Sequence, residues 1–302
     1  MMVMDYPQTF QPVFDGLGLK VLETFREGPR FYIVGGEYQG ERVVFKADVE
    51  GPSGESTRAR LKLRREAAFL ESVKLESIPR FFAKGTHQGY FWLIEEWVPG
   101  ESQEWRESTF LFKPTFFTPQ NLELSLGFLG ALQGLFPTDG GLFKRYTLAD
   151  YEAVVVSDKD KTIGKNLARR VKDFVTARHK LFDGNQTVVT HHELYSPHIF
   201  VEGRELNVID WENVGWGNPA YDFTELWMRS FTHPDFQKEL WARFRHSQDD
   251  QETFDQLFSL ETVLQGLGNL KLFKFPRVPE ETAVAQKAGR FFLESLERVL
   301  VR

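Results

Sequence analysis

Residues 188–210 read VVTHHELYSPHIFVEGRELNVID, and this stretch decides the fold. It holds three short apolar runs of the kind found in buried strands, separated by polar loop residues. Glu193 and His198 lie between the first two runs, and Asp210 ends the third. We therefore expect these three side chains at the ends of adjoining strands. Ionisable groups there are costly to bury unless they bind something, which makes the stretch the candidate site.

The residue types in this stretch suit phosphoryl transfer. That reaction uses one carboxylate to take the proton of the attacking hydroxyl, a second to hold the metal on the phosphates, and a further polar group for a second metal. Protein kinases arrange these groups as HRDxxxxN and then a separate Asp; here the order is His191, Glu193, His198 and then Asp210. The alternative is that Glu193 and His198 form a buried hydrogen-bonded pair without a catalytic role.

The residues that follow carry a closer likeness. Residues 209–212 read IDWE, and residues 217–222 read GNPAYD. Kinase-like small-molecule phosphotransferases typically read HGDxxxxN, then IDWE, then GDPxxD, so the chain resembles the aminoglycoside phosphotransferase and choline kinase group. The resemblance implies that Asp210 is the main magnesium ligand. It also implies that Asp222 braces the catalytic loop from the following helix.

The catalytic loop departs from this family pattern. Glu193 stands at the position of the catalytic Asp and would be the base; it is one methylene longer, and positioning errors of about 1 Å cost roughly 100-fold in rate. His198 stands at the position of the Asn and would be an atypical second metal ligand, which suits Mn²⁺ better than Mg²⁺. His192 replaces a small Gly. By resemblance, His191 supports the loop rather than doing chemistry.

The first hundred residues agree with the same family. Lys46 ends a β-rich run and resembles the strand lysine that contacts the α- and β-phosphates of ATP, and Glu66 resembles its helix partner. An ion pair between them would hold the lysine extended. Taken alone, each would be a solvent-facing residue. Residues 93–100, LIEEWVPG, resemble the hinge, where backbone groups near Glu95 and Trp97 would pair with adenine.

Residues 26–30, REGPR, stand where the family has its phosphate loop. Gly28 is the only glycine in this segment, and Pro29 removes a backbone donor. Arg30 would add a positive charge toward the phosphates or would face solvent. The phosphate contact is therefore assigned to Gly28 and Arg30 by position rather than by a glycine-rich motif.

Composition narrows the class of protein. The 302 residues carry a net charge of −6, with Lys and Arg mixed among Asp and Glu, so we expect no basic surface for nucleic acid. The negative charge suits a cationic small-molecule acceptor. The sequence has no cysteine, which excludes disulfides and Cys-ligated zinc. It shows no signal-peptide pattern and no apolar run near the roughly 20 residues of a membrane helix, so we expect a cytoplasmic protein.

We expect an α+β protein with the bilobal protein-kinase-like fold. A small β-rich lobe at residues 1–96 would bind the nucleotide. A larger helical lobe at residues 97–302 would hold the catalytic loop, the metal site and the acceptor, with the cleft near residues 95–101. Expected strands lie at 31–34, 42–46, 80–83, 90–95, 187–190, 198–202 and 206–210, with a turn at 35–40. Expected helices lie at 58–75, with Leu61, Ala68, Phe69 and Val73 inward, at 122–135, at 158–182 and beyond 222.

Other reaction classes fit less well. A zinc protease needs HExxH on one helix face, whereas His198 comes six residues after His192 and Pro197 would disrupt a helix. Neither a GxSxG elbow nor a P-loop motif occurs. We therefore expect an ATP-dependent phosphotransferase that acts on a hydroxyl of a small molecule with Mg²⁺ or Mn²⁺. The alternative is a degenerate kinase-like protein that binds nucleotide or a partner without efficient transfer. The acceptor, the choice of ATP or GTP and the oligomeric state stay open.

Overall fold

The computed structural model describes residues 6–50, 57–105, 111–138, 141–151, 163–273 and 281–301. The chain divides into two compact units. The first unit comprises Met1–Gly100, Pro137–Phe143 and Asn207–Val214, and the second comprises Glu101–Phe136, Lys144–Leu206 and Gly215–Arg302. Each unit therefore combines segments that are far apart in the sequence.

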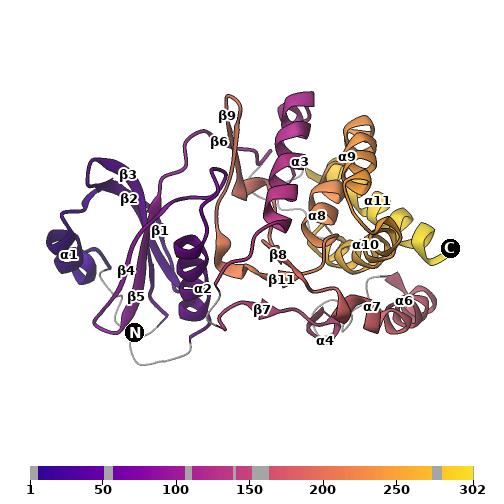
Figure 1. Ribbon diagram of the computed structural model, residues 1–302, viewed down its shortest axis with the longest axis horizontal. Helices are drawn as coiled ribbons and strands as arrows, with labels where there is room; N and C mark the ends of the chain where they lie inside the picture. Colours follow the sequence, from indigo (N-terminus) through magenta and orange to yellow (C-terminus); the bar gives the residue numbers. More distant parts are fainter. Residues whose placement is uncertain are drawn as a thin grey trace. The chain divides into compact units, whose positions relative to one another are not determined.

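An antiparallel five-stranded sheet forms the centre of the first unit (Figure 1). Its strand order is β1-β2-β3-β5-β4, and every neighbouring pair is antiparallel. The four strands expected in this region are present, whereas β1 and the preceding helix α1 were not expected. The elements are α1 (Tyr6–Leu17), β1 (Lys20–Glu27), β2 (Phe31–Tyr38), β3 (Glu41–Asp48), β4 (Phe81–His87) and β5 (Tyr90–Glu96).

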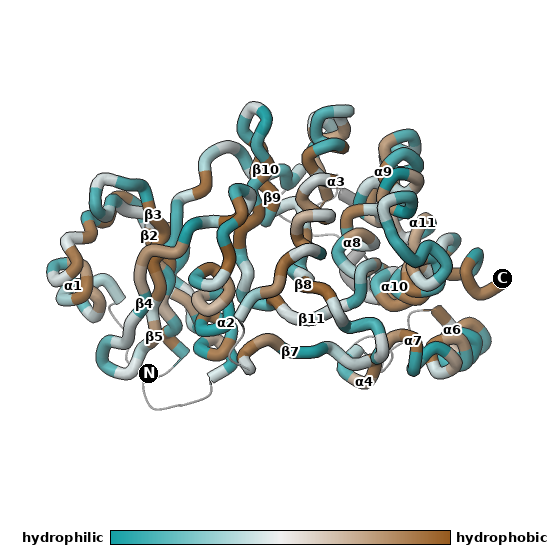
Figure 2. The backbone as a smooth tube through the Cα atoms, viewed as in Figure 1, coloured by the Kyte–Doolittle hydropathy of each residue, from teal (hydrophilic) through white to brown (hydrophobic). Residues whose placement is uncertain are grey.

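Each face of this sheet carries an apolar cluster, because a helix covers each of them. Phe10 and Phe14 of α1 pack against one face, and Leu63 and Ala67 of α2 (Arg58–Ser72) pack against the other. Side chains alternate between the faces along a strand, so consecutive residues of β2 and β5 join opposite clusters. Strands β2, β3 and β5 are accordingly among the brown, hydrophobic parts of Figure 2. Strand β5 thus reads as a continuous apolar run from Tyr90 to Ile94, whereas every residue of β1 is exposed.

The turn expected at residues 35–40 is much shorter in the structure. Gly35 and Gly36 continue strand β2, and the turn is confined to Gln39 and Gly40. A Cβ atom on Gly35 would lie 2.2 Å from the ring of Trp97, which is far closer than real Cβ contacts. Glycine is therefore needed here for close packing rather than for a turn, which explains the wrong prediction.

Helix α2 lies where a helix was expected, but of the residues expected to face inward Leu61 is exposed and Ala68 is only half-buried. Thr57 caps its N-terminus by accepting a hydrogen bond from the Arg60 amide at 3.2 Å. Phe69 and Val73 are buried as expected, whereas Leu61 is 41% exposed. Leu61 precedes Leu63 by two residues, which is about 200° around a helix, so the two side chains face opposite directions.

Helices dominate the second unit (Figure 1). The helix expected at 158–182 is interrupted at Arg178, and residues 158–162 lie outside the described residues. Leu260 and Leu264 of α10 pack with residues of α6, α7 and α11 in the main apolar cluster. The helices are α3 (Pro119–Gln133), α4 (Leu148–Tyr151), α6 (Lys165–Ala177), α7 (His179–Gly184), α8 (Tyr221–Arg229), α9 (Pro234–His246), α10 (Gln251–Phe273) and α11 (Glu281–Val301).

Short strands position the loop of interest. The sheets have the orders β7-β11-β8 and β10-β9-β6. The last expected strand ends at Val208 rather than at Asp210, because Asp210 adopts a left-handed conformation with φ of 68°. The strands are β6 (Glu101–Ser102), β7 (Lys144–Arg145), β8 (Val188–Thr190), β9 (Ile199–Glu202), β10 (Glu205–Val208) and β11 (Gly215–Gly217).

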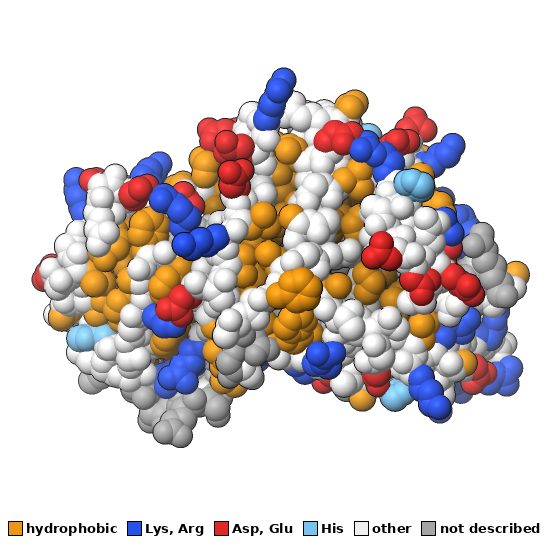
Figure 3. All heavy atoms as spheres, viewed as in Figure 1, with side chains coloured by type: hydrophobic (Ala, Val, Ile, Leu, Met, Phe, Trp, Pro, Cys, Tyr) orange, Lys and Arg blue, Asp and Glu red, His pale blue; other side chains and the backbone are white. Residues whose placement is uncertain are grey.

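Surface charge follows the mixed pattern of the sequence. On the face drawn in Figure 3, Lys and Arg side chains are interspersed with Asp and Glu rather than gathered in one basic patch. Among the helices that the structure describes, none has both the length and the apolar run needed to cross a bilayer.

Candidate active site

Lys46 is buried in the first unit between two carboxylates. Its Nζ lies 2.8 Å from Oε1 of Glu66 on α2 and 2.7 Å from Oε1 of Glu95 on β5. All three side chains are at most 10% exposed. The lysine is thus held by short charge-assisted contacts on both sides.

The alternation of the strands explains how these groups meet. Phe45 and Ala47 face α1, so Lys46 between them faces α2, where Glu66 lies. Lys46 pairs with Leu93 across the sheet, and Glu95 follows Leu93 by two residues on the same face. Such a diagonal neighbour is within reach of a long side chain. The ion pair between Lys46 and Glu66 was expected, whereas the participation of the Glu95 side chain was not.

This cluster contains more carboxyl groups than basic groups. Burial alone would lower the pKa of Lys46, but the charges of Glu66, Glu95 and Asp210 raise it well above its usual value. Burial, together with the neighbouring carboxylates, raises the pKa of Glu66 and of Glu95 against the pull of Lys46. Lys46 therefore stays protonated at neutral pH, and the carboxyl groups of Glu66, Glu95 and Asp210 act on its single positive charge.

A tight turn brings Asp210 to this cluster within the first unit. Asp210 precedes a 3₁₀ turn at Trp211–Asn213, and the Trp211 amide donates to Oε1 of Glu66 at 3.0 Å. The Trp211 ring is fully buried and stacks on Phe69 at 4.4 Å between ring centroids. Glu66 therefore joins Lys46 to the backbone of the Asp210 turn, and the aromatic stack fixes that turn on α2.

Gly28 and Arg30 occupy the turn between β1 and β2. The Gly28 amide donates to the Phe31 carbonyl at 3.0 Å, and the Arg30 carbonyl accepts from the Val49 amide at 2.9 Å. The Arg30 side chain is exposed. The turn thus keeps its own backbone hydrogen bonds, and a phosphate contact from it stays a prediction.

Trp97 ends the segment expected to bind adenine. Its amide donates to the Arg42 carbonyl at 3.1 Å, and its ring lies under the Arg42 guanidinium at 3.9 Å. Adenine would therefore have to replace the Arg42 contact to use the Trp97 amide. The adenine contact at Glu95 and Trp97 stays a prediction.

In the second unit, Asp222 of α8 holds the start of the loop at residues 191–198. Its Oδ2 accepts from the His191 amide at 2.7 Å, and its Oδ1 accepts from the His192 amide at 3.1 Å. Burial raises the pKa of Asp222 to about 7, although both amide hydrogen bonds favour the charged form. This carboxyl group acts on the backbone of the loop, in the place where the resemblance put a bracing acid.

Glu225 holds the same loop and was missed in the sequence. Its Oε2 accepts from the Leu194 amide at 2.9 Å, and burial raises its pKa to about 8. Glu225 follows Asp222 by three residues, so both lie on one face of α8. That spacing was the only sequence signal for a second supporting acid.

The loop residues 193 and 198 contact each other through a backbone atom. Nδ1 of His198 lies 2.7 Å from the Glu193 carbonyl, which can only accept a hydrogen bond. A neutral His198 therefore carries its proton on Nδ1, and Nε2 keeps a lone pair. His191, which is fully buried, accepts a hydrogen bond on Nδ1 from the Glu193 amide at 3.2 Å. This hydrogen bond joins the His198 ring to the backbone of Glu193, and the non-catalytic alternative stays a prediction.

His192 adopts a left-handed conformation with φ of 68°. Glycine takes this conformation without strain, which accounts for the small residue common in the family. Here the side chain forms contacts instead: Nε2 lies 2.7 Å from Thr190 Oγ1, and the ring centroid lies 3.8 Å from that of Tyr146. His192 therefore has a less favourable backbone conformation than glycine would have, but it gains side-chain contacts.

The family model of the phosphotransferase enzyme family matches residues 26–257. The chain therefore belongs to this family, as the resemblance in its sequence indicated. No curated protein matches the sequence closely enough to count as a relative.

Solved structures give the same fold at low sequence identity. A thermostable mutant of the aminoglycoside phosphotransferase APH(4)-Ia, in its apo form, is 12% identical with a TM-score of 0.53, and the match covers 95% of this chain and 97% of that one. A choline/ethanolamine kinase family protein from Mesorhizobium loti is 15% identical with a TM-score of 0.54, covering 97% and 96%. The protein thus has the α+β, protein-kinase-like fold that was expected.

Proposed function

We propose that this protein transfers the γ-phosphoryl group of ATP to a hydroxyl group of a small molecule. The family and the fold are those of kinase-like phosphotransferases. The observation that carries the proposal is the buried Lys46, held at 2.8 Å from Glu66 and linked through it to the turn of Asp210. A buried ion pair on a strand and a helix, next to a further acid, is the arrangement that protein kinases use around ATP phosphates.

In this proposal Lys46 contacts the α- and β-phosphates, and Glu66 orients Lys46. Asp210 holds Mg²⁺ or Mn²⁺, and the excess of carboxyl groups over the single lysine in this cluster suits a divalent cation. The metal, when bound, would supply positive charge at the phosphate oxygens. We assign the nucleotide to residues 1–96, with Gly28, Arg30, Glu95 and Trp97 as further contacts, and the catalytic loop and acceptor to residues 97–302.

Glu193 is the proposed base, which takes the proton of the attacking hydroxyl. The amides on either side of it are held by Asp222 and Glu225, so the loop backbone is fixed whichever acid occupies position 193. His198 is the proposed second metal ligand through Nε2, since the Glu193 carbonyl engages Nδ1. A histidine ligand favours Mn²⁺ over Mg²⁺ at this position.

The proposed acceptor is a small hydroxylated molecule, and the net charge of −6 favours a cationic one. Crystal structures of APH(4)-Ia mutants, at 14% and 13% identity, are ternary complexes of hygromycin B with ADP or AMP-PNP. These neighbours support a nucleotide and a small-molecule acceptor as the ligand classes to test first. A panel of aminoglycosides and of amino alcohols covers the acceptors of both neighbour groups.

The thermal midpoint tests this proposal. We expect ATP to raise the midpoint in Mg²⁺ or Mn²⁺ but not in chelator, because a ligand of the folded state stabilises it. Asp210→Asn should abolish the metal-dependent rise, and Asp255→Asn, an acid of α10 outside the site, should not. A rise that is equal in metal and in chelator would contradict the assignment of Asp210.

A second candidate function is nucleotide binding without efficient transfer. It is favoured by Glu193 and His198, which stand where the family has Asp and Asn. Glu193→Gln separates the two functions: an enzyme should lose roughly 100-fold or more in kcat and keep its ATP-induced midpoint shift. If no acceptor yields ADP above the background hydrolysis of ATP, and Glu193→Gln changes nothing, the protein is a binder.

A further inference from the structure

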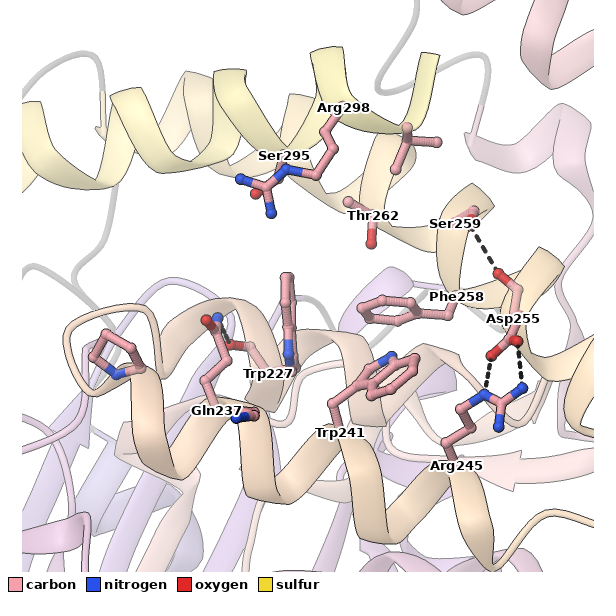
Figure 4. Close-up of a pocket in the computed structure, with 13 residues that line it drawn as sticks. Trp227, Gln237, Trp241, Arg245, Asp255, Phe258, Ser259, Thr262, Ser295 and Arg298 are labelled. Carbon is pink, nitrogen blue, oxygen red and sulfur yellow. Dashed lines mark hydrogen bonds and ion pairs between the residues drawn. The ribbon is translucent and has the colours of Figure 1, made fainter. Parts of the chain in front are cut away.

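A cavity of about 500 Å³ lies among helices α8, α9, α10 and α11 of the second unit (Figure 4). No residue of the loop at 191–198 lines it. Its volume is within the range of sites that hold small organic ligands. The helices that surround it belong to one compact unit, so its walls do not depend on the position of the first unit.

Aromatic side chains form much of the wall. Trp227, Trp241 and Phe258 line the cavity, and the rings of Trp227 and Phe258 meet edge to face at 5.0 Å between centroids. Such rings offer flat apolar surfaces to a planar ligand. The wall of the cavity therefore suits an aromatic group of a ligand.

Several polar groups of the wall already have partners. Arg245 forms a two-pronged ion pair with Asp255 at 2.7 and 2.8 Å, and Ser259 donates to the Asp255 carbonyl at 2.8 Å. Gln237 donates to the Trp227 carbonyl at 2.8 Å. These contacts, drawn as dashed lines in Figure 4, leave little capacity for a ligand.

Three other polar atoms of the wall are buried and have no hydrogen-bond partner among the described residues: Trp241 Nε1, Thr262 Oγ1 and Ser295 Oγ. Thr262 is 2% exposed and Ser295 is 4% exposed. In Figure 4 the hydroxyl of Thr262 points into the space between the helices, toward the rings of Trp227 and Phe258. A buried polar group without a partner is unfavourable, so three of them around one cavity point to a polar group on a ligand.

The charged residues of the wall indicate whether the polar group of the ligand is positive or negative. Lys238, Arg245 and Arg298 line the cavity with a single acid, Asp255, which is engaged by Arg245. Among the described residues, Lys238 and Arg298 have no acid in the wall left to pair with. The indole N–H of Trp241 can only donate, and the two hydroxyls can donate as well. All the available groups therefore suit an acceptor with negative charge.

We propose that this cavity binds a small aromatic carboxylate, with its ring against Trp227, Trp241 and Phe258 and its carboxylate toward Thr262, Ser295 and Arg298. The site is separate from the residues of the proposed phosphoryl transfer. It needs neither ATP nor a metal.

Isothermal titration calorimetry of the full chain tests this site, with naphthaleneacetate as the probe and naphthaleneacetamide as its uncharged counterpart. We expect saturable binding of the carboxylate, and at least tenfold weaker binding of the amide. The indole N–H resonance of Trp241, assigned with Trp241→Phe, should shift with the carboxylate. These readouts do not involve nucleotide, so they stay valid whether or not the protein transfers phosphate.

Variants locate the binding. Thr262→Val keeps the shape of the side chain and should weaken the carboxylate about tenfold, the usual effect of losing a hydrogen bond to a charged group. Arg298→Gln should weaken the carboxylate about fivefold and leave the amide unchanged. The matched control is Arg290→Gln, an exposed arginine of the same helix that does not line the cavity. Ser295→Phe should fill the cavity and remove both.

Three results would overturn the proposal. One is the absence of any heat or Trp241 shift with the carboxylate at millimolar concentration. Another is equal affinity for the carboxylate and the amide, which would remove the role of charge. The last is binding that survives Ser295→Phe in a protein whose circular dichroism and thermal midpoint are those of the parent.

Discussion

The Lys46 cluster of the first unit and the loop at residues 191–198 of the second unit both bury carboxyl groups, but they satisfy them differently. Glu66 and Glu95 contact the ammonium of Lys46, so charge is matched with charge. Asp222 and Glu225 contact backbone amides of the loop, so these carboxyl groups are matched with backbone dipoles.

The two regions should therefore tolerate different amino-acid substitutions. In the first cluster the side chains themselves are the partners, and removing one leaves the others uncompensated. In the loop the partners are backbone amides, which every residue except proline supplies. The unusual Glu193 and His198 can therefore occupy the loop without disturbing the contacts that shape it. The four predictions below test that contrast, from the largest expected effect to the smallest.

Lys46→Met should have the largest effect on the free energy of unfolding. It leaves Glu66 and Glu95 buried without their cation, and breaking a buried pair from one side costs about 3 kcal/mol. Urea unfolding measures this loss. The control is Lys84→Met, which breaks the exposed pair with Glu71 and should cost less than about 1 kcal/mol. Equal losses in the two variants would show that Lys46 is not essential to its cluster.

Asp222→Asn should cost about 2 kcal/mol, because an amide side chain offers one acceptor oxygen to two donors and turns its own N–H₂ toward one of them. Hydrogen exchange at the His191 and His192 amides should accelerate together with the loss of stability. Glu225→Gln should cost less, since a single oxygen can still accept from the Leu194 amide. If Glu225→Gln were the more harmful change, the loop would depend on charge rather than on hydrogen-bond count.

The carboxyl group of Glu261 should make the stability of the fold depend on pH. It is fully buried, accepts from Asn218 at 2.6 Å and from Gln265 at 3.1 Å, and burial raises its pKa to about 7. Between its unfolded and folded pKa values the folded protein keeps a proton that the unfolded chain releases. Stability should therefore fall as pH rises from about 4.5 to about 7, by on the order of 1 kcal/mol per pH unit for this group.

Glu261→Gln, which imitates the protonated form, should flatten that dependence without abolishing it, since Asp222 and Glu225 titrate in a similar range. Urea midpoints measured from pH 5 to pH 8 give the comparison. An unchanged slope would show that Glu261 keeps its ordinary pKa in the folded protein.

The smallest expected effect concerns two residues with left-handed backbones. Gln88 has φ of 48° in the exposed turn between β4 and β5, so Gln88→Gly should raise stability by about 0.5 kcal/mol. His192→Gly relieves the same kind of strain but loses the contact with Thr190 Oγ1, and should lower stability by about 1 kcal/mol. A gain from both substitutions would mean that the His192 contacts contribute little.

The ion pair between Lys46 and Glu66 was predicted from the sequence and is present in the structure. Lys46 and Asp210 end apolar runs typical of strands, and Glu66 lies in a segment with helical spacing. The three residues occur in the same order along the chain as in the family motifs. Glu95 was given a backbone role because its side chain reaches Lys46 only through the register of β3 against β5. Such a register depends on the whole sheet rather than on any short stretch.

The errors have similar causes. Gly35 and Gly36 have the composition of a turn, but close packing requires them inside a strand. The ring of Trp97, more than sixty residues away in the chain, leaves no room for a Cβ atom at Gly35, and the Lys20 carbonyl of the neighbouring strand leaves none at Gly36. Leu61 is apolar enough for a core position, and its exposure follows from which face of α2 meets the sheet. Glu225 lacked any motif, although its spacing from Asp222 was visible. Tertiary packing, rather than local propensity, decided each of these positions.

The carboxyl groups of Asp222, Glu225 and Glu261 also affect the heat of unfolding. With pKa values of about 7, 8 and 7 in the folded state, they hold protons near neutral pH that the unfolded chain gives up to the buffer. An amine buffer takes up a proton with more heat released than phosphate does. The calorimetric enthalpy of unfolding at pH 7 should therefore be smaller in an amine buffer than in phosphate. The difference between the two enthalpies gives the number of protons that the carboxyl groups release on unfolding.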